Sequence, residues 1–150
     1  DCVPNDWEDG YDNVIVGCTV ENQEMTDKRL PIFLTLPIKH KRIIVAPMIT
    51  AIDLFSYLNE TIEEVSVGGE SGMDARPCRY DWILDIRKQC ISKDVAFRFH
   101  QTGACLIKDG KMFRIPRCHQ LSQAHKANID YKTEQYLVPE KVKFEWEDSK

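Results

Sequence analysis

The sequence lacks a long hydrophobic run. No stretch approaches the roughly 18 consecutive apolar residues of a transmembrane helix, and the first residues lack the pattern of a secretory signal peptide. We therefore expect no membrane association and a cytoplasmic location. An excess of charge of one sign is missing too: 24 acidic residues stand against 20 basic ones. Without a strong basic field, nucleic acid is not an expected partner.

A closely spaced cysteine motif is also missing. The sequence contains six cysteines but no Cys-x-x-Cys pair, which argues against a zinc ribbon or a contiguous iron–sulfur motif. Cys18 and Cys90 lie in apolar patterns and are expected to be buried, in a reducing compartment. A zinc alternative can be assembled from residue types alone, but its spacing matches no familiar finger, and we predict no metal site. Its members would be Cys105, Cys118, His119 and His125.

The composition that is present favours a globular α/β protein. Apolar residues make up 43% and charged residues 29% of the 150 positions, and a chain of this length can bury a sizeable core. We expect a single domain over 1–150, with an α/β core over about 12–104 and a β-hairpin with a polar tail over 105–150. The opening residues Asp1–Asn5 have no start-of-domain character, so we expect an excerpt of a longer protein.

Strand-like and helix-like segments alternate through the predicted core. Apolar, β-branched runs predict four strands, at Val14–Val20, Ile43–Pro47, Glu63–Val67 and Val95–His100. Spacing and capping predict helices at Gln23–Arg29, Asp53–Leu58 and Tyr80–Cys90. Pro31 is expected to open a separate short turn, which Pro37 ends. This alternation predicts a parallel four-stranded sheet with right-handed crossover helices.

The last third follows a different pattern. Asp109-Gly110 predicts a hairpin between Cys105–Lys108 and Lys111–Ile115, since both central positions tolerate positive φ. A short helix is expected at Leu121–Ala127. From Val138 we expect a marginal strand or a frayed end.

The segment Val65–Pro77 is the most distinctive in the sequence: a strand that runs into a glycine-rich loop holding Glu70, Ser71 and Arg76. Glycines can adopt the positive φ angles that turn successive amides toward an anion, and the Arg76 fork suits a phosphate or carboxylate. Two alternatives stay open. The loop can be a tight turn into a helix capped by Ser71 or Asp74, and Arg76 can form an ion pair with Asp74 or Asp81.

Polar residues gather at the ends of three predicted strands, where ligands of parallel α/β sheets bind. Glu21, Glu70 and His100 are predicted to form an acid–base or ligand-binding set. The other predicted binding residues lie in the same three segments; they are Asn22, Gly68, Gly69, Ser71, Arg76 and Gln101. Alternatively, Glu21 and Asn22 start a helix and His100 is an interior residue.

Several motifs in order resemble a known family. They are Thr19-Val20-Glu21-Asn22-Gln23, Val67-Gly68-Gly69-Glu70-Ser71-Gly72, Ala75-Arg76-Pro77, Asp81-Trp82, Arg87-Lys88-Gln89-Cys90 and Phe99-His100-Gln101-Thr102-Gly103. Together they resemble the phage gene-product-37/gene-product-68 family of unknown function, over about Asn5–Tyr131. That family resembles radical S-adenosylmethionine proteins, which implies a partial or half TIM-like barrel.

The resemblance also carries functional expectations. Gly68-Gly69-Glu70 is similar to the element that holds the amino group of S-adenosylmethionine in radical enzymes. S-adenosylmethionine and a [4Fe–4S] cluster are expected only in a full-length parent, because the cluster cysteines are not in this sequence. The chain would then be the C-terminal half of such an enzyme, supplying substrate and cofactor contacts, and not catalytic by itself.

Two other functions remain open. The chain can be a non-catalytic module that binds an anion or a nucleotide, or a structural phage accessory protein. The expected ligand is a small molecule with a phosphate or carboxylate group. Exposed sheet edges would favour self-association or pairing with the missing half.

Overall fold

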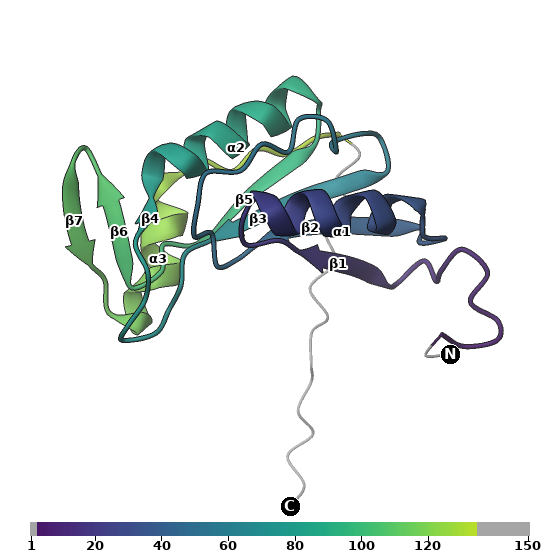
Figure 1. The fold of residues 1–150 in the computed structure, drawn as a ribbon, viewed down its shortest axis with the longest axis horizontal. Helices are drawn as coiled ribbons and strands as arrows, with labels where there is room; N and C mark the ends of the chain where they lie inside the picture. The colour runs from purple at the N-terminus through teal and green to yellow at the C-terminus, as the bar shows by residue number, and fades with distance from the viewer. Residues whose placement is uncertain (1–2, 135–150) are drawn as a thin grey trace, which may run out of the picture.

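A four-stranded parallel sheet forms the centre of the computed structural model, which describes residues 3–134 (Figure 1). Its strand order is β1-β2-β3-β5. The strands are β1 (Ile15–Thr19), β2 (His40–Val45), β3 (Ile62–Gly68) and β5 (Ala96–Gln101). All three neighbouring pairs are parallel, which confirms the predicted α/β class and the predicted sheet.

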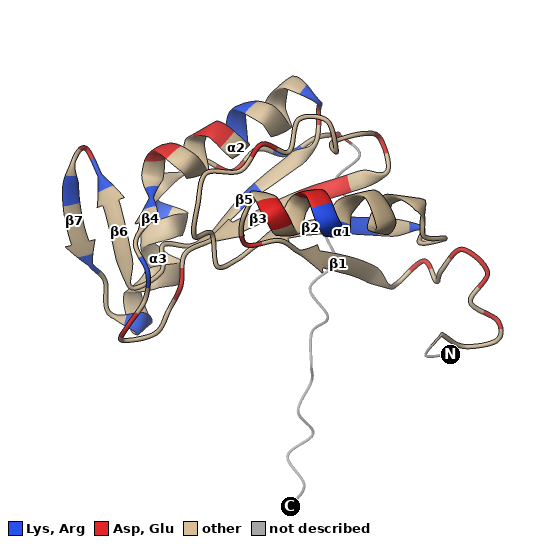
Figure 2. Ribbon diagram, in the orientation of Figure 1, with Lys and Arg blue, Asp and Glu red and all other residues tan. Residues whose placement is uncertain are grey.

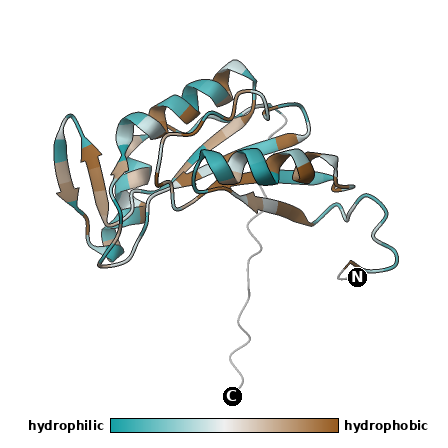
Figure 3. Cartoon of the chain, viewed as in Figure 1, coloured by the Kyte–Doolittle hydropathy of each residue, from teal (hydrophilic) through white to brown (hydrophobic). Residues whose placement is uncertain are grey.

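One face of the sheet carries the core. Side chains alternate along each strand, so one set of apolar residues shares a face and is almost fully buried. Its members are Ile43, Val45, Val65, Val67, Phe97 and Phe99. They form one cluster with apolar residues of α1 (Gln23–Thr35) and α2 (Tyr80–Ser92). In Figure 3 hydrophobic colour follows β1 and β6, whereas both helices carry hydrophilic stretches.

The opposite face of the sheet is more polar. Thr19, Ser66 and Arg98 alternate onto this side and are exposed or partly exposed. Glu64 is nearly fully buried here and lies 2.9 Å from the guanidinium of Arg42. The sheet therefore has one apolar face covered by helices and one face that holds charged groups.

Helix α1 differs from the prediction at its proline. The expected break at Pro31 is absent, and one helix runs from Gln23 to Thr35. Proline removes one intrahelical hydrogen bond, but Leu30 and Phe33, on either side of it, are buried against the sheet. Tertiary packing therefore outweighs the local preference. Helix α2 matches its prediction closely.

The predicted helix at Asp53–Leu58 is wrong: this segment forms turns. Leu54 and Leu58 are buried, so the apolar spacing correctly indicated burial. The side-chain oxygen of Gln89 accepts a hydrogen bond from the Leu54 amide at 2.6 Å, and its side-chain nitrogen donates to the Ile52 carbonyl at 3.3 Å. A six-residue segment has little helical stability of its own, and these side-chain bonds fix another conformation.

A second, three-stranded sheet follows at the carboxyl end of the first. It contains β4 (Cys78–Arg79), β6 (Cys105–Lys108) and β7 (Lys111–Arg114), in the order β4-β6-β7. β6 and β7 run antiparallel around Asp109 and Gly110, which have φ of 51° and 73°. The strand or frayed end expected from Val138 lies outside the described residues.

Helix α3 (Arg117–Ala127) follows β7 and begins earlier than expected. It packs against β5, and its Ala124 joins the main core. In the sequence, the antiparallel pair therefore comes between β5 and α3 and is not the last element of the described chain. None of the three helices in residues 3–134 is long and apolar enough to cross a membrane.

Candidate functional site

The four parallel strands end at one edge of the sheet, which we call the carboxyl rim. It comprises the segments 19–22, 46–48, 68–71 and 100–103. The Met48 amide donates to the Gly68 carbonyl at 2.8 Å, and the Ile49 amide donates to the Glu21 carbonyl at 3.1 Å. Backbone hydrogen bonds therefore connect the segment after β2 to the segments after β1 and β3.

Glu70 and Arg76 are paired with each other. Arg76 Nε donates to Glu70 Oε2 and Arg76 Nη2 to Glu70 Oε1, both at 2.8 Å. The Arg76 backbone amide also donates to Glu70 Oε2 at 2.8 Å. These hydrogen bonds lower the pKa of Glu70 from its ordinary 4.5 to about 2. The carboxylate is therefore ionised and fixed in one orientation at neutral pH.

This pairing resolves the open alternatives for Arg76. Its partner is Glu70 and neither of the alternatives, Asp74 or Asp81; Asp81 lies instead 3.4 Å from Arg79. The loop is also not a capped turn into a helix, since it leads to β4, and the residue before α2 provides no side-chain cap. Glu70 and Arg76 are six residues apart in a loop, so the sequence did not indicate that their side chains point toward each other.

The glycines of the loop after β3 allow its backbone to lie close to the backbone of the loop after β5. Within residues 3–134, positive φ occurs at Gly10, Gly103 and Gly110 among the glycines, so the expected left-handed conformation of Gly68 and Gly69 is wrong. A Cβ on Gly69 would lie 2.4 Å from the Thr102 carbonyl oxygen. A Cβ on Gly103, which has φ +74°, would lie 2.7–2.8 Å from backbone atoms of Gly69 and Glu70. The two loops thus pack backbone against backbone.

Gln101 and Ser71 join this contact. Gln101 Nε2 donates to the Gly69 carbonyl at 2.9 Å and lies 3.4 Å from Ser71 Oγ. The Gly69 amide donates to the Gln101 carbonyl at 3.1 Å, and the Ala104 amide donates to the Glu70 carbonyl at 2.7 Å. The structure therefore brings the predicted residues of the β3 and β5 loops together, with the Gln101 amide used in holding them.

Glu21 and Asn22 lie where β1 turns into α1. The Asn22 side chain accepts from the Met25 amide at 2.9 Å, so it is the N-cap of α1. Glu21 pairs with Arg29 at 2.8 Å, and Arg29 also donates to the Thr19 carbonyl at 2.7 Å. Arg29 was missed from the sequence, although its place two turns into the predicted helix could have indicated it. The pKa of Arg76 is raised chiefly by its hydrogen bonds to Glu70, and the charge of Glu21 raises it further.

His100 occupies a β-bulge. Val67 lies beside Phe99 and Gly68 beside Gln101, so His100 is the extra residue of β5. Its side chain is exposed, yet partial burial, Arg98 and His125 lower its pKa, which favours the neutral imidazole. Among the described contacts, His100 has no hydrogen bond or ion pair with Glu21 or Glu70. The predicted acid–base set is therefore divided: Glu21 pairs with Arg29, Glu70 pairs with Arg76, and His100 contacts neither carboxylate.

Most of the described cysteines are buried or partly buried. Cys78 and Cys90 are buried, and burial raises the pKa of each thiol to about 12. Cys18 is half-buried. Residues 3–134 contain no group of three or more His, Cys, Asp or Glu side chains that could hold a metal ion. The structure therefore does not bring Cys105, Cys118, His119 and His125 together as one group.

The parallel sheet, its crossover helices and its polar carboxyl rim define an α/β protein with the usual ligand position of that class. The chain belongs to the family described as "Protein of unknown function (DUF5131)", whose model matches residues 2–137. No curated protein and no solved structure matches the chain. The phage naming and the radical S-adenosylmethionine relation therefore stay predictions.

Proposed function

We propose that the carboxyl rim binds the amino-acid end of a small molecule, and that S-adenosylmethionine is this ligand. The Glu70–Arg76 pair is the observation that carries the proposal. It places a fixed negative and a fixed positive group side by side at the end of β3, and both side chains keep access to solvent, at 29% and 55% exposure.

The pair has bonding capacity left over. Among the described residues Glu70 Oε1 accepts a hydrogen bond only from Arg76 Nη2, so its second lone pair can accept a hydrogen bond from a ligand ammonium group. Arg76 Nη1 donates to no described residue, so it can bind a ligand carboxylate. In an amino acid the ammonium nitrogen and the carboxylate carbon are only two bonds apart. Glu70 and Arg76 are in direct contact, so they can bind these two neighbouring groups at the same time. The similarity of Gly68-Gly69-Glu70 to the amino-group element supports the same assignment.

S-adenosylmethionine supplies a reactive sulfonium centre when bound. Glu70 and Arg76 would hold its amino-acid end, while Glu21, Ser71 and His100 lie on the same rim and would face the rest of the ligand. Asn22 and Gln101 would support the site by capping α1 and holding the loops together. The described cysteines do not form a set that fits an iron–sulfur cluster. No step through such a cluster follows from this chain.

Calorimetric titration of the full chain with S-adenosylmethionine, methionine and inorganic phosphate tests the proposal. We expect binding of S-adenosylmethionine and weaker binding of methionine, and Glu70→Gln should weaken both by about tenfold or more through loss of a charge-assisted contact. Asp85→Asn, which removes the exposed Asp85–Lys88 pair on α2, is the matched control and should leave binding unchanged.

Phosphate separates this proposal from an anion-binding module. Glu70→Gln releases the Arg76 guanidinium from its carboxylate, so an anion site should bind phosphate as well as before or better. Phosphate binding that survives Glu70→Gln, with no heat from S-adenosylmethionine, would favour the module and contradict the proposal.

The sheet supports a half TIM-like barrel in a longer protein as part of the same proposal. Its strands lie in the sequential order β1-β2-β3-β5, all parallel, as consecutive strands do in a (β/α) barrel. Pairing with another half would cover the edge of β1 and the polar face. An experimental structure of a longer protein that shows these strands in an open, doubly wound sheet would contradict this.

A further inference from the structure

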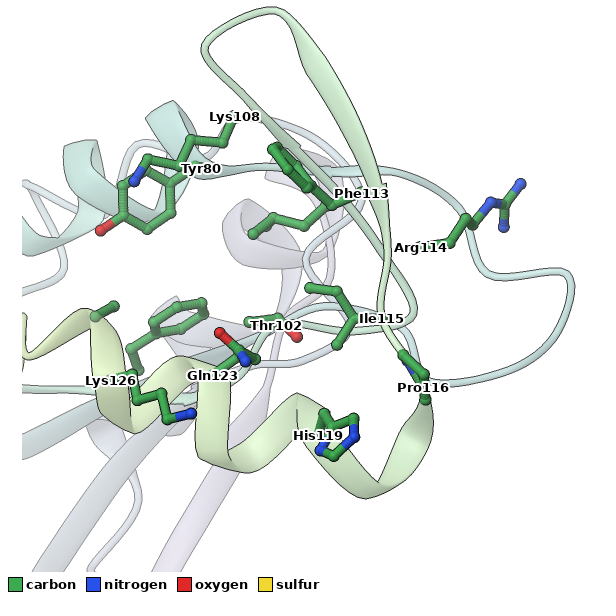
Figure 4. A pocket seen from close by; sticks show the side chains of 13 residues that line it. Tyr80, Thr102, Lys108, Phe113, Arg114, Ile115, Pro116, His119, Gln123 and Lys126 are labelled. Carbon is green, nitrogen blue, oxygen red and sulfur yellow. The ribbon is translucent and has the colours of Figure 1, made fainter.

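A cavity of about 700 Å³ lies beside the β6–β7 pair, away from the Glu70–Arg76 pair. Its walls come from the start of α2, from β6 and β7, and from α3, and its inner end reaches Phe99 and Thr102 of the β5 region (Figure 4). Small-molecule sites typically measure about 300–1,000 Å³. The cavity is therefore large enough for a ligand of nucleotide size.

Aromatic rings form one side of this cavity. Tyr80 and Phe113 lie on the same side in Figure 4, and the Tyr80 ring packs near the buried Phe99, with 6.2 Å between ring centroids. Phe113 is 45% exposed, an unusual position for a large apolar ring. A flat aromatic group entering the cavity would gain contact with both outer rings.

Basic and polar side chains form the other side. Gln123, Lys126 and His119 extend from α3 opposite the rings (Figure 4). Lys108 lies above the Tyr80 ring, with its Nζ 4.9 Å from the centroid, whereas the Arg114 guanidinium points away from the cavity.

No described Asp or Glu lines the cavity, and no described carboxylate pairs with Lys108 or Lys126. In Figure 2 basic positions lie along β6 and β7 and at the start of α3, and an acidic position lies at the hairpin tip. The chain has a net charge of −4, so a lining whose charged side chains are all basic departs from the average of the molecule. Such a lining is complementary to an anion.

We propose that this cavity binds a free mononucleotide, with the base against Tyr80 and Phe113 and the phosphate near Lys126 and His119. A mononucleotide combines the two required features, a flat aromatic ring and a dianionic group at its other end. Stacking on an aromatic side chain is sequence-tolerant, so the cavity selects the class of ligand rather than one base. This site does not use Glu70 or Arg76 and is independent of the function proposed for the rim.

Calorimetric titration of the full chain with adenosine monophosphate tests the inference, with adenosine and inorganic phosphate as the two separate parts. We expect the monophosphate to bind at least tenfold more tightly than either part. Lys126→Gln should weaken it about tenfold by removing a charge-assisted contact. Phe113→Ala should weaken adenosine and the monophosphate alike, because it removes the stacking surface.

The controls come from an exposed lysine and ring elsewhere in the chain. Lys93 lies over the Phe55 ring at 4.1 Å, and neither residue lines this cavity. Lys93→Gln and Phe55→Ala should leave the affinity unchanged, and so should Glu70→Gln, which separates this site from the rim. If Lys126→Gln has no effect, or phosphate binds as tightly as the monophosphate, the inference is wrong. Tighter binding of a single-stranded oligonucleotide would also overturn it.

Discussion

The carboxyl rim and the β6–β7 cavity differ in how their charges are used. At the rim, Arg29 pairs with Glu21 and Arg76 pairs with Glu70. In the cavity, Lys108 and Lys126 have no described carboxylate partner. Charges that already have partners hold the loops in place and offer a ligand only their remaining lone pairs and protons. Charges without partners are free to bind an incoming anion. The two regions should therefore respond differently to substitution.

Backbone packing at the rim should give the largest effect. Gly69→Ala would place a Cβ 2.4 Å from the Thr102 carbonyl oxygen, so one loop must move. We expect a loss of about 2–3 kcal/mol in the free energy of unfolding, measured by urea denaturation. Gly72→Ala is the matched control, since its Cβ would meet nothing within 4 Å. Equal effects of the two substitutions would show that the loops do not pack as described.

Removing the rim charge should have a smaller effect. Glu70→Gln replaces an ion pair that is partly open to solvent, so we expect a loss of about 0.5–1 kcal/mol at pH 7 in the same measurement. A double-mutant cycle with Arg76→Ala should show that the two losses are not additive, because both substitutions remove the same contact. Additive losses would contradict the pairing.

The same contact should depend on pH. The pKa of Glu70 is lower in the folded protein, about 2, than its ordinary 4.5, so between these values the unfolded chain binds more protons. The stability that wild type gains over Glu70→Gln should be complete above about pH 4.5 and should disappear as the pH falls toward 2. A difference that persists unchanged at pH 2.5 would contradict an ionised, paired Glu70.

The cavity should give the smallest change in stability. Lys126→Gln removes a charge that has no described partner, so we expect the free energy of unfolding to stay within about 0.5 kcal/mol of wild type. Its effect should appear instead in the affinity for adenosine monophosphate. A large loss of stability would indicate that Lys126 has a structural contact, and the contrast between the two regions would fail.

Local patterns predicted the sheet well because buried parallel strands are short, continuous apolar runs. Ile43–Val45 and Val65–Val67 show this directly. The same reasoning failed at Asp53–Leu58, where the apolar spacing was real but the Gln89 side chain fixed turns. It also failed at Pro31, where burial of Leu30 and Phe33 supports a continuous helix.

The candidate site was harder to predict because it depends on contacts between loops. The carboxyl rim follows from parallel strands, so Glu21, Glu70 and His100 could be placed at one edge. The ion-pair partners of these carboxylates could not be predicted, because the pairing of Arg29 with Glu21 and of Arg76 with Glu70 depends on how the loops fold. The bulge at His100 arises from the register of β5 against β3, which no pattern within one strand records. The β6–β7 cavity likewise joins segments that are distant in sequence.

Amide chemical shifts of the isotope-labelled full chain, followed by NMR during two separate titrations, test the contrast most directly. S-adenosylmethionine should shift the amides of Gly69, Glu70, Ser71 and Arg76. Adenosine monophosphate should shift those of Phe113, Gln123 and Lys126. Two separate sets of shifted residues would support a paired rim and an unpaired cavity as different sites. One shared set, or no shift at Glu70 and Arg76 with S-adenosylmethionine, would contradict the account.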